Sequence, residues 1–322
     1  MAGFTISVVI PVKNGSATLE RCLRSLRNQT LGKELEIIIA DSMSVDNSRE
    51  IALQYGATII DIPEGSFDHG LTRNLAAQQA SGQLIYFTVQ DAWAASNDML
   101  EKMATHFEDG LVKAVVGHQA VPHEKDKNPM LWFRPVSAAS VTERLVTDPD
   151  NFKNLPVKEQ QALAAWDNVV AMYRKTALTE QPFVQTAFAE DWIWSYNALQ
   201  KGWKLLHDSS LLVYHYHHHT FQYAFRTTYT INYHFYKFFG YIPTAVLPFM
   251  PLIRVSWHVG KNKRLRFAER VYWIGHNFLS VTATFLSNLD FLIRLKAGRK
   301  NAVEKGYNKY CKLIPQGKQK QQ

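Results

Sequence analysis

The sequence predicts an α/β protein with a Rossmann-like, mostly parallel sheet flanked by helices and extended by a C-terminal helical region. Short β-branched runs alternate with helical patterns over residues 4–93, as in βαβ units. Several of these runs end at an acidic residue, where ligands gather in parallel sheets. Beyond residue 221 the chain is rich in aromatic and basic residues. We therefore expect one domain over residues 1–222 and a second, mostly helical region over residues 223–322.

The elements of the first half follow from these patterns in order. FTISVVIPV, residues 4–12, is a β-branched run followed by the turn residues KNGS, and is typical of a buried strand. Residues 16–30 then carry leucines at helical spacing. The alternation continues with predicted strands at 34–42, 57–63 and 83–93 and predicted helices at 44–56, 71–82 and 95–107.

The middle of the chain is less regular. Residues 120–165 are polar and proline-rich, which indicates a long functional insertion with some helix around VKEQQALAAW. A short strand (NVVAMYRK), a helix (EDWIWSYNALQKG) and a further strand (WKLLHDSSLLVYH) follow. Apolar residues at helical spacing between Phe267 and Leu292 predict a long amphipathic helix in the C-terminal region.

Composition restricts the class of protein. The formal charge of +8 suits anionic partners such as nucleotide diphosphates, anionic lipid or nucleic acid, but no nucleic-acid-binding motif is present. Cys22 and Cys311 are the only cysteines and have no metal-type spacing, which favours a reducing compartment. The N-terminal residues lack the pattern of a signal peptide, and no run of about 18 uncharged apolar residues predicts a transmembrane helix.

Three acidic positions are candidates for chemistry. Asp41 and Asp91 each close a predicted strand, where a carboxylate can hold a ribose, a base or a divalent ion. Glu190 and Asp191 are adjacent at the start of a predicted helix, where an ionised carboxylate can act as a general base. The structural alternative at each position is the capping of the next helix.

The segment LLVYHYHHHTF contains four histidines within positions 215–219, directly after the last predicted strand. Alternation along an extended segment places His215 and His217 on one face. An imidazole and a carboxylate such as that of Asp91 suit Mn²⁺ or Mg²⁺. The alternative is that all four histidines are structural or solvent-facing.

These motifs, taken in order over roughly residues 5–220, resemble the family 2 glycosyltransferases of the GT-A fold. The resemblance implies that Asp41 holds the nucleotide base, with Pro11 and Asn14 beside it at the end of the first strand. It also implies that Asp91, in the place of the DXD motif, holds metal and diphosphate. Asp191 of the ED motif, next to Glu190, is then the general base. The DXD motif is QDA here, so one metal-binding acid is missing, and a histidine after the last strand would complete the site.

A finer resemblance is to bacterial rhamnosyltransferases that use dTDP-β-L-rhamnose. It is carried by the segments GSFDHGLTRN, VQDA and VYHYHHHT. It implies that part of the first segment contacts the donor, with Arg73 on the diphosphate and Gly70 allowing close backbone approach. The structural alternative for Arg73 is an ion pair within the protein. The predicted donor-binding residues are Pro11, Asn14, Asp41, Asp68, His69, Gly70, Arg73, Asn74, Gln90 and Asp91.

On the acceptor side, WDNVVAMYRK resembles the stretch that precedes the ED motif. Asp167 and Asn168 are expected to bind sugar hydroxyls. Trp166, Trp192 and Trp194 can stack on a sugar face or equally be core residues, and Trp192 is the one expected to bind the acceptor. The apolar and basic C-terminal region is expected to lie on an anionic membrane surface at the cytoplasmic face of the inner membrane. The alternative is a helical subdomain or a homo-oligomer contact.

The sequence thus predicts an inverting, metal-dependent glycosyltransferase. It would move L-rhamnose from dTDP-β-L-rhamnose to a hydroxyl of a glycan or lipid-linked glycan. One alternative keeps the fold and uses a UDP-hexose or another nucleotide sugar. Another alternative is a non-catalytic nucleotide-sugar-binding scaffold at the membrane, favoured by QDA in place of DXD and disfavoured by the intact ED pair.

Overall fold

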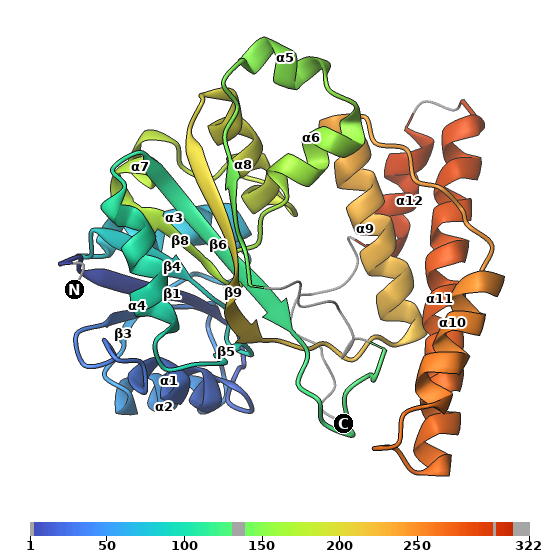
Figure 1. The fold of residues 1–322 in the computed structure, drawn as a ribbon, viewed down its shortest axis with the longest axis horizontal. Coiled ribbons are helices and arrows are strands. Elements are labelled where there is room, and N and C mark those ends of the chain that lie inside the picture. Colours follow the sequence, from blue (N-terminus) through green and yellow to red (C-terminus); the bar gives the residue numbers. More distant parts are fainter. Residues whose placement is uncertain (1–2, 131–138, 299–300, 312–322) are drawn as a thin grey trace. The chain divides into compact units, whose positions relative to one another are not determined.

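The chain divides into an α/β unit and a helical unit (Figure 1). The computed structural model describes residues 3–130, 139–298 and 301–311. The α/β unit comprises residues 1–120 and 135–216, and the helical unit comprises residues 121–134 and 217–322.

A sheet of nine strands forms the centre of the α/β unit. In chain order the strands are β1 (Ile6–Val12), β2 (Glu36–Asp41), β3 (Thr58–Asp61), β4 (Leu84–Phe87), β5 (Trp93–Ala94), β6 (Val112–Ala120), β7 (Val141–Arg144), β8 (Ala171–Arg174) and β9 (Lys204–Tyr214). Eight of them follow the order β3-β2-β1-β4-β8-β6-β9-β5, and β7 pairs with β9. Strands β3, β2, β1 and β4 run parallel to one another, and β6 is parallel to β9. The pairs β4–β8, β8–β6, β9–β5 and β7–β9 are antiparallel.

Helices cover both faces of this sheet (Figure 1). They are α1 (Leu19–Arg27), α2 (Ser48–Gln54), α3 (His69–Gln79), α4 (Met99–Thr105), α5 (Pro149–Asn154), α6 (Val157–Ala164), α7 (Lys175–Glu180) and α8 (Glu190–Gln200). Side chains of β1 alternate between the two faces, as the pleat requires. Val8 and Ile10 pack in one core cluster with Leu23 of α1, whereas Val9 packs in the other with Ala76 of α3. The predicted α/β fold with flanking helices is confirmed, but the sheet is mixed, with four parallel and four antiparallel pairs, where a mostly parallel sheet was expected.

Strand β6 was missed by the sequence analysis, which assigned no element to residues 112–120. Its second half, GHQA, has the composition of a loop. The structure shows why a glycine is needed in the strand. A Cβ on Gly117 would lie 2.3 Å from the Leu211 carbonyl oxygen and 2.6 Å from a methyl of Val170. The strand register shifts between Val116 and His118, so the polar end of β6 continues as an irregular pairing with β9.

The middle insertion is more ordered than its composition predicts. It contains the edge strand β7 and the helices α5 and α6, and α6 covers most of the helix expected around VKEQQALAAW. Pro149 stands in the first turn of α5 after the N-cap Asp148, whose side chain accepts hydrogen bonds from Asp150 and Asn151. Proline here begins an element instead of interrupting one.

The helical unit is built on α9 (Phe221–Phe239), α10 (Phe249–Gly260), α11 (Phe267–Lys296) and α12 (Ala302–Tyr310). Tyr229 of α9, Phe291 of α11 and Tyr307 of α12 form its small aromatic core. The side chains of Asn128 and Asn277 exchange two hydrogen bonds, at 2.9 and 3.0 Å, and both are buried. The short segment 121–130 is thereby fastened to α11 within the same unit.

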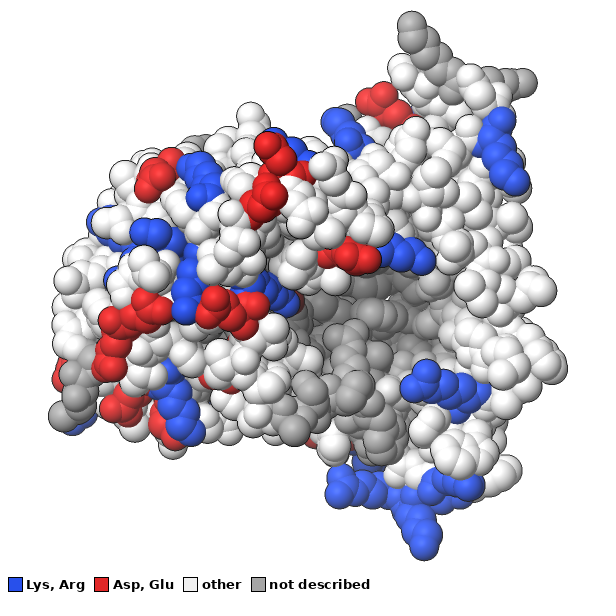
Figure 2. Space-filling model, turned by 45° about the horizontal axis from the view of Figure 1, so that its top comes forward, with Lys and Arg blue, Asp and Glu red and all other residues white. Residues whose placement is uncertain are grey.

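Helix α11 is longer and more apolar than the sequence analysis anticipated. Its best window has a mean hydropathy of 1.3, and only 17% of that window is buried. By length and composition alone, the helix could therefore cross a membrane. This is weak evidence, since a core helix of a soluble protein passes the same test. Figure 2 shows large uncharged areas on this unit, with Lys and Arg side chains gathered near its lower end.

Candidate active site

The nucleotide-side candidates lie in the loops that follow β1 and β2, at the carboxyl ends of two parallel strands. Asp41 ends β2, is fully buried, accepts a hydrogen bond from the Ser44 N–H and pairs with Arg49 at 2.9 Å. Asn14 has a left-handed backbone (φ 48°), and its side-chain oxygen accepts from the Val45 N–H at 2.9 Å. Pro11 lies in β1, one residue before its end. The two loops thus hold each other, and this edge of the sheet is where ligands of such folds bind.

Gln90 fixes the loop after β1 from the neighbouring strand end. Its side-chain oxygen accepts a hydrogen bond from the Lys13 N–H at 3.0 Å. A Cβ on Gly15 would lie 2.5 Å from the same oxygen, so the glycine lets the loop approach. The glutamine of the QDA motif therefore supports the loop backbone, and Asp91 is the acid that remains for an ion.

Asp91 and His215 meet because of the pairing between β5 and β9. Trp93 stands opposite Tyr214 in this antiparallel pair, which brings the residues that precede Trp93 close to those that follow Tyr214. Asp91 Oδ1 lies 3.4 Å from His215 Nε2. Together with His217, two residues further along the chain, they offer three ligand atoms within 4.8 Å of one another. A carboxylate oxygen and imidazole nitrogens at this spacing fit a divalent ion such as Mn²⁺ or Mg²⁺.

Gln119, which the sequence analysis did not single out, orients His215. The Gln119 side-chain nitrogen donates to Asp167 Oδ2, which leaves its oxygen to face His215 Nδ1 at 2.7 Å. Since the amide oxygen can only accept, Nδ1 is the donor in this contact, and Nε2 is the nitrogen that faces Asp91. No sequence signal distinguishes this glutamine, because its role depends on the unforeseen strand β6.

The predicted base, Asp191, lies in the first turn of α8. Asp191 Oδ1 accepts a hydrogen bond from the Trp192 N–H at 2.8 Å, and Asp191 Oδ2 accepts one from the Asn168 N–H at 3.3 Å. Burial, followed by the charges of Glu190 and Asp167, raises the pKa of Asp191 well above its usual range. Burial likewise raises the pKa of Asp167. A carboxyl whose pKa is shifted toward neutrality is suited to proton transfer at physiological pH.

The three acceptor-side candidates have different environments. Asp167 and Trp192 are half-buried at the site. Asn168 is buried, and its side chain accepts from the Tyr173 hydroxyl at 2.6 Å and donates to Glu190 Oε1 at 3.4 Å. Its amide group is therefore engaged inside the protein. Trp166 and Trp194 are buried core residues, which is the alternative that the sequence analysis left open for them.

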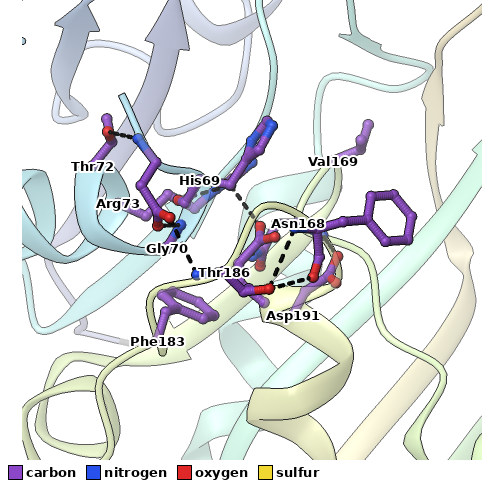
Figure 3. A network of polar contacts seen from close by, with 12 residues as sticks. His69, Gly70, Thr72, Arg73, Asn168, Val169, Phe183, Thr186 and Asp191 are labelled. Carbon is purple, nitrogen blue, oxygen red and sulfur yellow. Dashed lines mark hydrogen bonds and ion pairs between the residues drawn. The ribbon is translucent and has the colours of Figure 1, made fainter. Parts of the chain in front are cut away.

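The segment Phe67–Asn74 forms the start of α3 and faces the loop that precedes α8 (Figure 3). Asp68 caps α3 by accepting from the N–H groups of Gly70 and Leu71, both at 2.9 Å. Arg73 pairs with Glu190 at 2.7 Å, with side chains that are 5% and 7% exposed. This is the structural alternative that the sequence analysis left open for Arg73.

His69 and Asn74 complete this segment. The His69 ring packs edge-on against Phe67 at 4.8 Å, and burial, with Arg73 nearby, lowers the pKa of its imidazole. Asn74 binds the backbone of Phe183 on both sides, donating to its carbonyl at 2.8 Å and accepting from its N–H at 3.0 Å. Both side chains are therefore held by protein contacts.

Comparison with known proteins identifies the family and the fold. Residues 7–175 match the model of the family described as Glycosyl transferase family 2. The O-antigen chain rhamnosyltransferase WbaN of Salmonella anatum is 33% identical over 225 residues, which cover 68% of each chain. The O-antigen chain rhamnosyltransferase RfbN of Salmonella typhimurium is 30% identical over 220 residues, which cover 67% of each chain.

Solved structures show the same fold at low sequence identity. S. aureus TarS 1–349 superposes with a TM-score of 0.53 at 15% identity, covering 95% of this chain and 83% of that chain. Its complex with UDP gives a TM-score of 0.52 at 14% identity, covering 90% of this chain and 91% of that one.

Proposed function

The chain belongs to glycosyltransferase family 2, and from this premise we propose that it transfers L-rhamnose from dTDP-β-L-rhamnose, with inversion, to a hydroxyl of a glycan acceptor. The rhamnosyltransferase relatives, similar over two thirds of the chain, support the choice of sugar. The proposed acceptor is a lipid-linked polysaccharide of the cell envelope, in keeping with the O-antigen activity named for both relatives.

One observation carries the proposal, namely a continuous series of polar contacts from Asp91 to the surroundings of Asp191. Asp91 faces His215, His215 contacts Gln119, and Gln119 donates to Asp167. The next residue, Asn168, donates its N–H to Asp191. A group suited to a diphosphate-bound ion and a group suited to a base therefore belong to one connected site in the α/β unit. A transfer reaction needs both, because a hydroxyl loses its proton as the diphosphate departs.

In the proposed mechanism, Asp191 accepts the proton of the acceptor hydroxyl. The oxygen then attacks the anomeric carbon from the face opposite the diphosphate. The new C–O bond forms as the bond to the diphosphate oxygen breaks, so the configuration inverts without a covalent enzyme intermediate. Asp91 with His215, and His217 beside it, would hold the divalent ion, which supplies charge neutralisation to the departing diphosphate. Asp167 and Trp192 are the side chains proposed to bind the acceptor sugar.

On the nucleotide side, we assign the base and ribose to the loops that carry Pro11, Asn14 and Asp41. Asp41 has one buried carboxylate oxygen turned away from its Arg49 partner. Gln90 supports these loops, and Asp68, His69 and Gly70 stay candidates for contacts with the donor. The assignments follow the family resemblance and the placement of these residues at the carboxyl edge of the sheet.

We propose that the helical unit rests on the cytoplasmic face of the inner membrane. Phe249, Met250 and Trp257 of α10 are 68%, 67% and 55% exposed, and Phe267 at the start of α11 is 80% exposed. The turn between these two helices carries four exposed basic residues, Lys261, Lys263, Arg264 and Arg266. Apolar side chains beside a basic cluster suit the headgroup region of an anionic leaflet. A homo-oligomer contact through the same unit is the alternative.

The proposal is tested with a panel of nucleotide sugars in Mn²⁺, Mg²⁺ or EDTA, reading nucleoside diphosphate release and the anomeric configuration of the product. We expect release from dTDP-rhamnose alone, lost with EDTA, and an α-linked product from the β-configured donor. Release from a UDP-hexose instead would overturn the rhamnose assignment and keep the fold. A β-linked product would overturn inversion. Co-sedimentation with vesicles containing anionic lipid, but not with neutral vesicles, tests the membrane assignment.

A further inference from the structure

The loop Phe183–Ala189 leads directly into the ED pair, and the first turns of α3 hold it in four separate ways (Figure 3). Asn74 binds the backbone of Phe183 through both ends of its amide, at 2.8 and 3.0 Å. Asp68 Oδ2 accepts from the Thr186 N–H at 3.1 Å. Arg73 pairs with Glu190 at 2.7 Å. The loop is thus fixed at its beginning, its middle and its end by one short segment.

Gly70 supplies the fourth restraint by its lack of a side chain. A Cβ at this position would lie 2.5 Å from the Val184 carbonyl oxygen and 3.0 Å from the Phe183 Cβ. The loop backbone therefore lies directly against α3. A glycine needed for close approach was expected here, but the structure shows that the partner is this loop of the same chain.

The start of α8 has little else of its own to define it. The N-cap residue, Ala189, has a left-handed backbone (φ 65°, ψ 30°) and no side-chain cap. A non-glycine residue in this conformation persists only where surrounding contacts impose it. Contacts from α3 supply this restraint, because Arg73 pairs with Glu190, the next residue. Asn168 also donates to Glu190.

We propose that Asp68, Gly70, Arg73 and Asn74 are positioning residues, which fix the loop before α8 and thereby the place of the Asp191 carboxylate. The inference rests on the proposed function, in which Asp191 is the base. In this inference, the FDHGLTRN segment mainly holds the loop before α8 in place and does not bind the diphosphate. A displacement of about 1 Å at a reacting group costs roughly 10²-fold in rate, so such restraints have a measurable effect.

The two roles of Arg73 predict opposite kinetics. If Arg73 binds the diphosphate, Arg73→Met weakens the binding of dTDP and raises KM for the donor. If it positions the base through Glu190, kcat falls about 10²-fold while the dTDP dissociation constant stays within about threefold. Arg73→Lys should recover part of kcat. Gln78→Ala, an exposed position on the same helix, is the matched control and should change neither.

Asn74→Ala provides a second variant that leaves the buried ion pair intact. It should also lower kcat without weakening dTDP binding measured by calorimetry. Amide hydrogen exchange gives a readout that needs no activity, since Phe183–Glu190 should lose protection in both variants and keep it in Gln78→Ala. Normal kcat with weak dTDP binding in Arg73→Met, or unchanged exchange in this loop, overturns the inference. Near-normal turnover of Asp191→Asn would instead overturn the proposed base, whatever the Arg73 variants do.

Discussion

The two sides of the site differ in the contacts that hold their acidic side chains. On the base side, Glu190 is neutralised by Arg73 and bonded to Asn168, and Asp191 accepts two backbone hydrogen bonds. On the proposed metal side, Asp91 and His215 face each other at 3.4 Å at the edge of the sheet. The base side is thus held by contacts within the chain, whereas on the proposed metal side Asp91 and His215 would hold an ion and, through it, the diphosphate. The difference separates variants that alter chemistry from variants that alter ligand dependence.

The largest effect is expected on the base side. Asp191→Asn removes the proton acceptor and should lower kcat by roughly 10²–10⁴-fold. Because the metal side is untouched, the affinity for dTDP with Mn²⁺ should stay within about threefold of the wild type. Turnover under saturating donor and calorimetric binding of dTDP measure the two quantities. Residual turnover close to wild type would remove the distinction between the two sides.

A smaller effect is expected on the metal side. Asp91→Asn and His215→Ala should each lower kcat/KM by about 10²-fold, because charge on the departing diphosphate is less well offset. Unlike the base variant, they should regain activity as the concentration of Mn²⁺ is raised. A titration with the ion at fixed donor distinguishes the two sides. Rates in these variants that are independent of Mn²⁺ would contradict the assigned ligands.

Gln119 joins the two sides, and its removal should have an intermediate consequence. Gln119→Leu frees the His215 ring to change tautomer. The affinity of the site for the ion should therefore fall by about 10-fold. In a His215→Ala background the same change should have no further effect on ion affinity, because no imidazole remains to be oriented. Additive losses in the double variant would show that Gln119 acts elsewhere.

The smallest effect concerns stability and follows from the raised pKa of Asp191. Its folded form keeps the proton at a pH where the unfolded chain has released it, so stability falls as pH rises from the ordinary carboxyl range through the raised pKa. Asp191→Asn lacks this loss. The melting temperature of the variant minus that of the wild type should therefore increase with pH. Each loss of about 1 kcal/mol in the wild type's free energy of unfolding corresponds to roughly 3 °C. A difference that is constant from pH 5 to pH 9 would contradict the buried, destabilising carboxyl.

The sequence predicted those elements whose patterns are local. β1, α1, β2 and α3 lie within or close to the expected ranges, because period-2 and helical spacing show directly in the residues. It did not predict β6, since the close approach of Leu211 to Gly117 joins residues far apart in the chain. The four antiparallel strand pairs were not predicted either, because they also join strands that are far apart in the chain.

Site residues divide along the same line. The motif order predicted the class of enzyme, which the family match confirms, and it proposed Asp91, Asp191 and His215 as site residues. It gave no reason to select Gln119, whose importance comes from two side chains at distant positions. Nor could it choose between the two roles of Arg73, because a buried partner such as Glu190 is visible only in three dimensions.

The register of β5 against β9 also bears on how the chain folds. Asp91 and His215 come from segments separated by most of the α/β unit's sequence, and they meet only when Trp93 has paired with Tyr214. That contact is among the least local in the chain, so it carries a large loop-closure cost and is expected to form late. In an unfolded or partly folded chain, the side chains of Asp91 and His215 are far apart. Binding of an ion by both Asp91 and His215 would therefore be thermodynamically linked to the pairing of β5 with β9. The bound ion would stabilise this late-forming edge of the sheet.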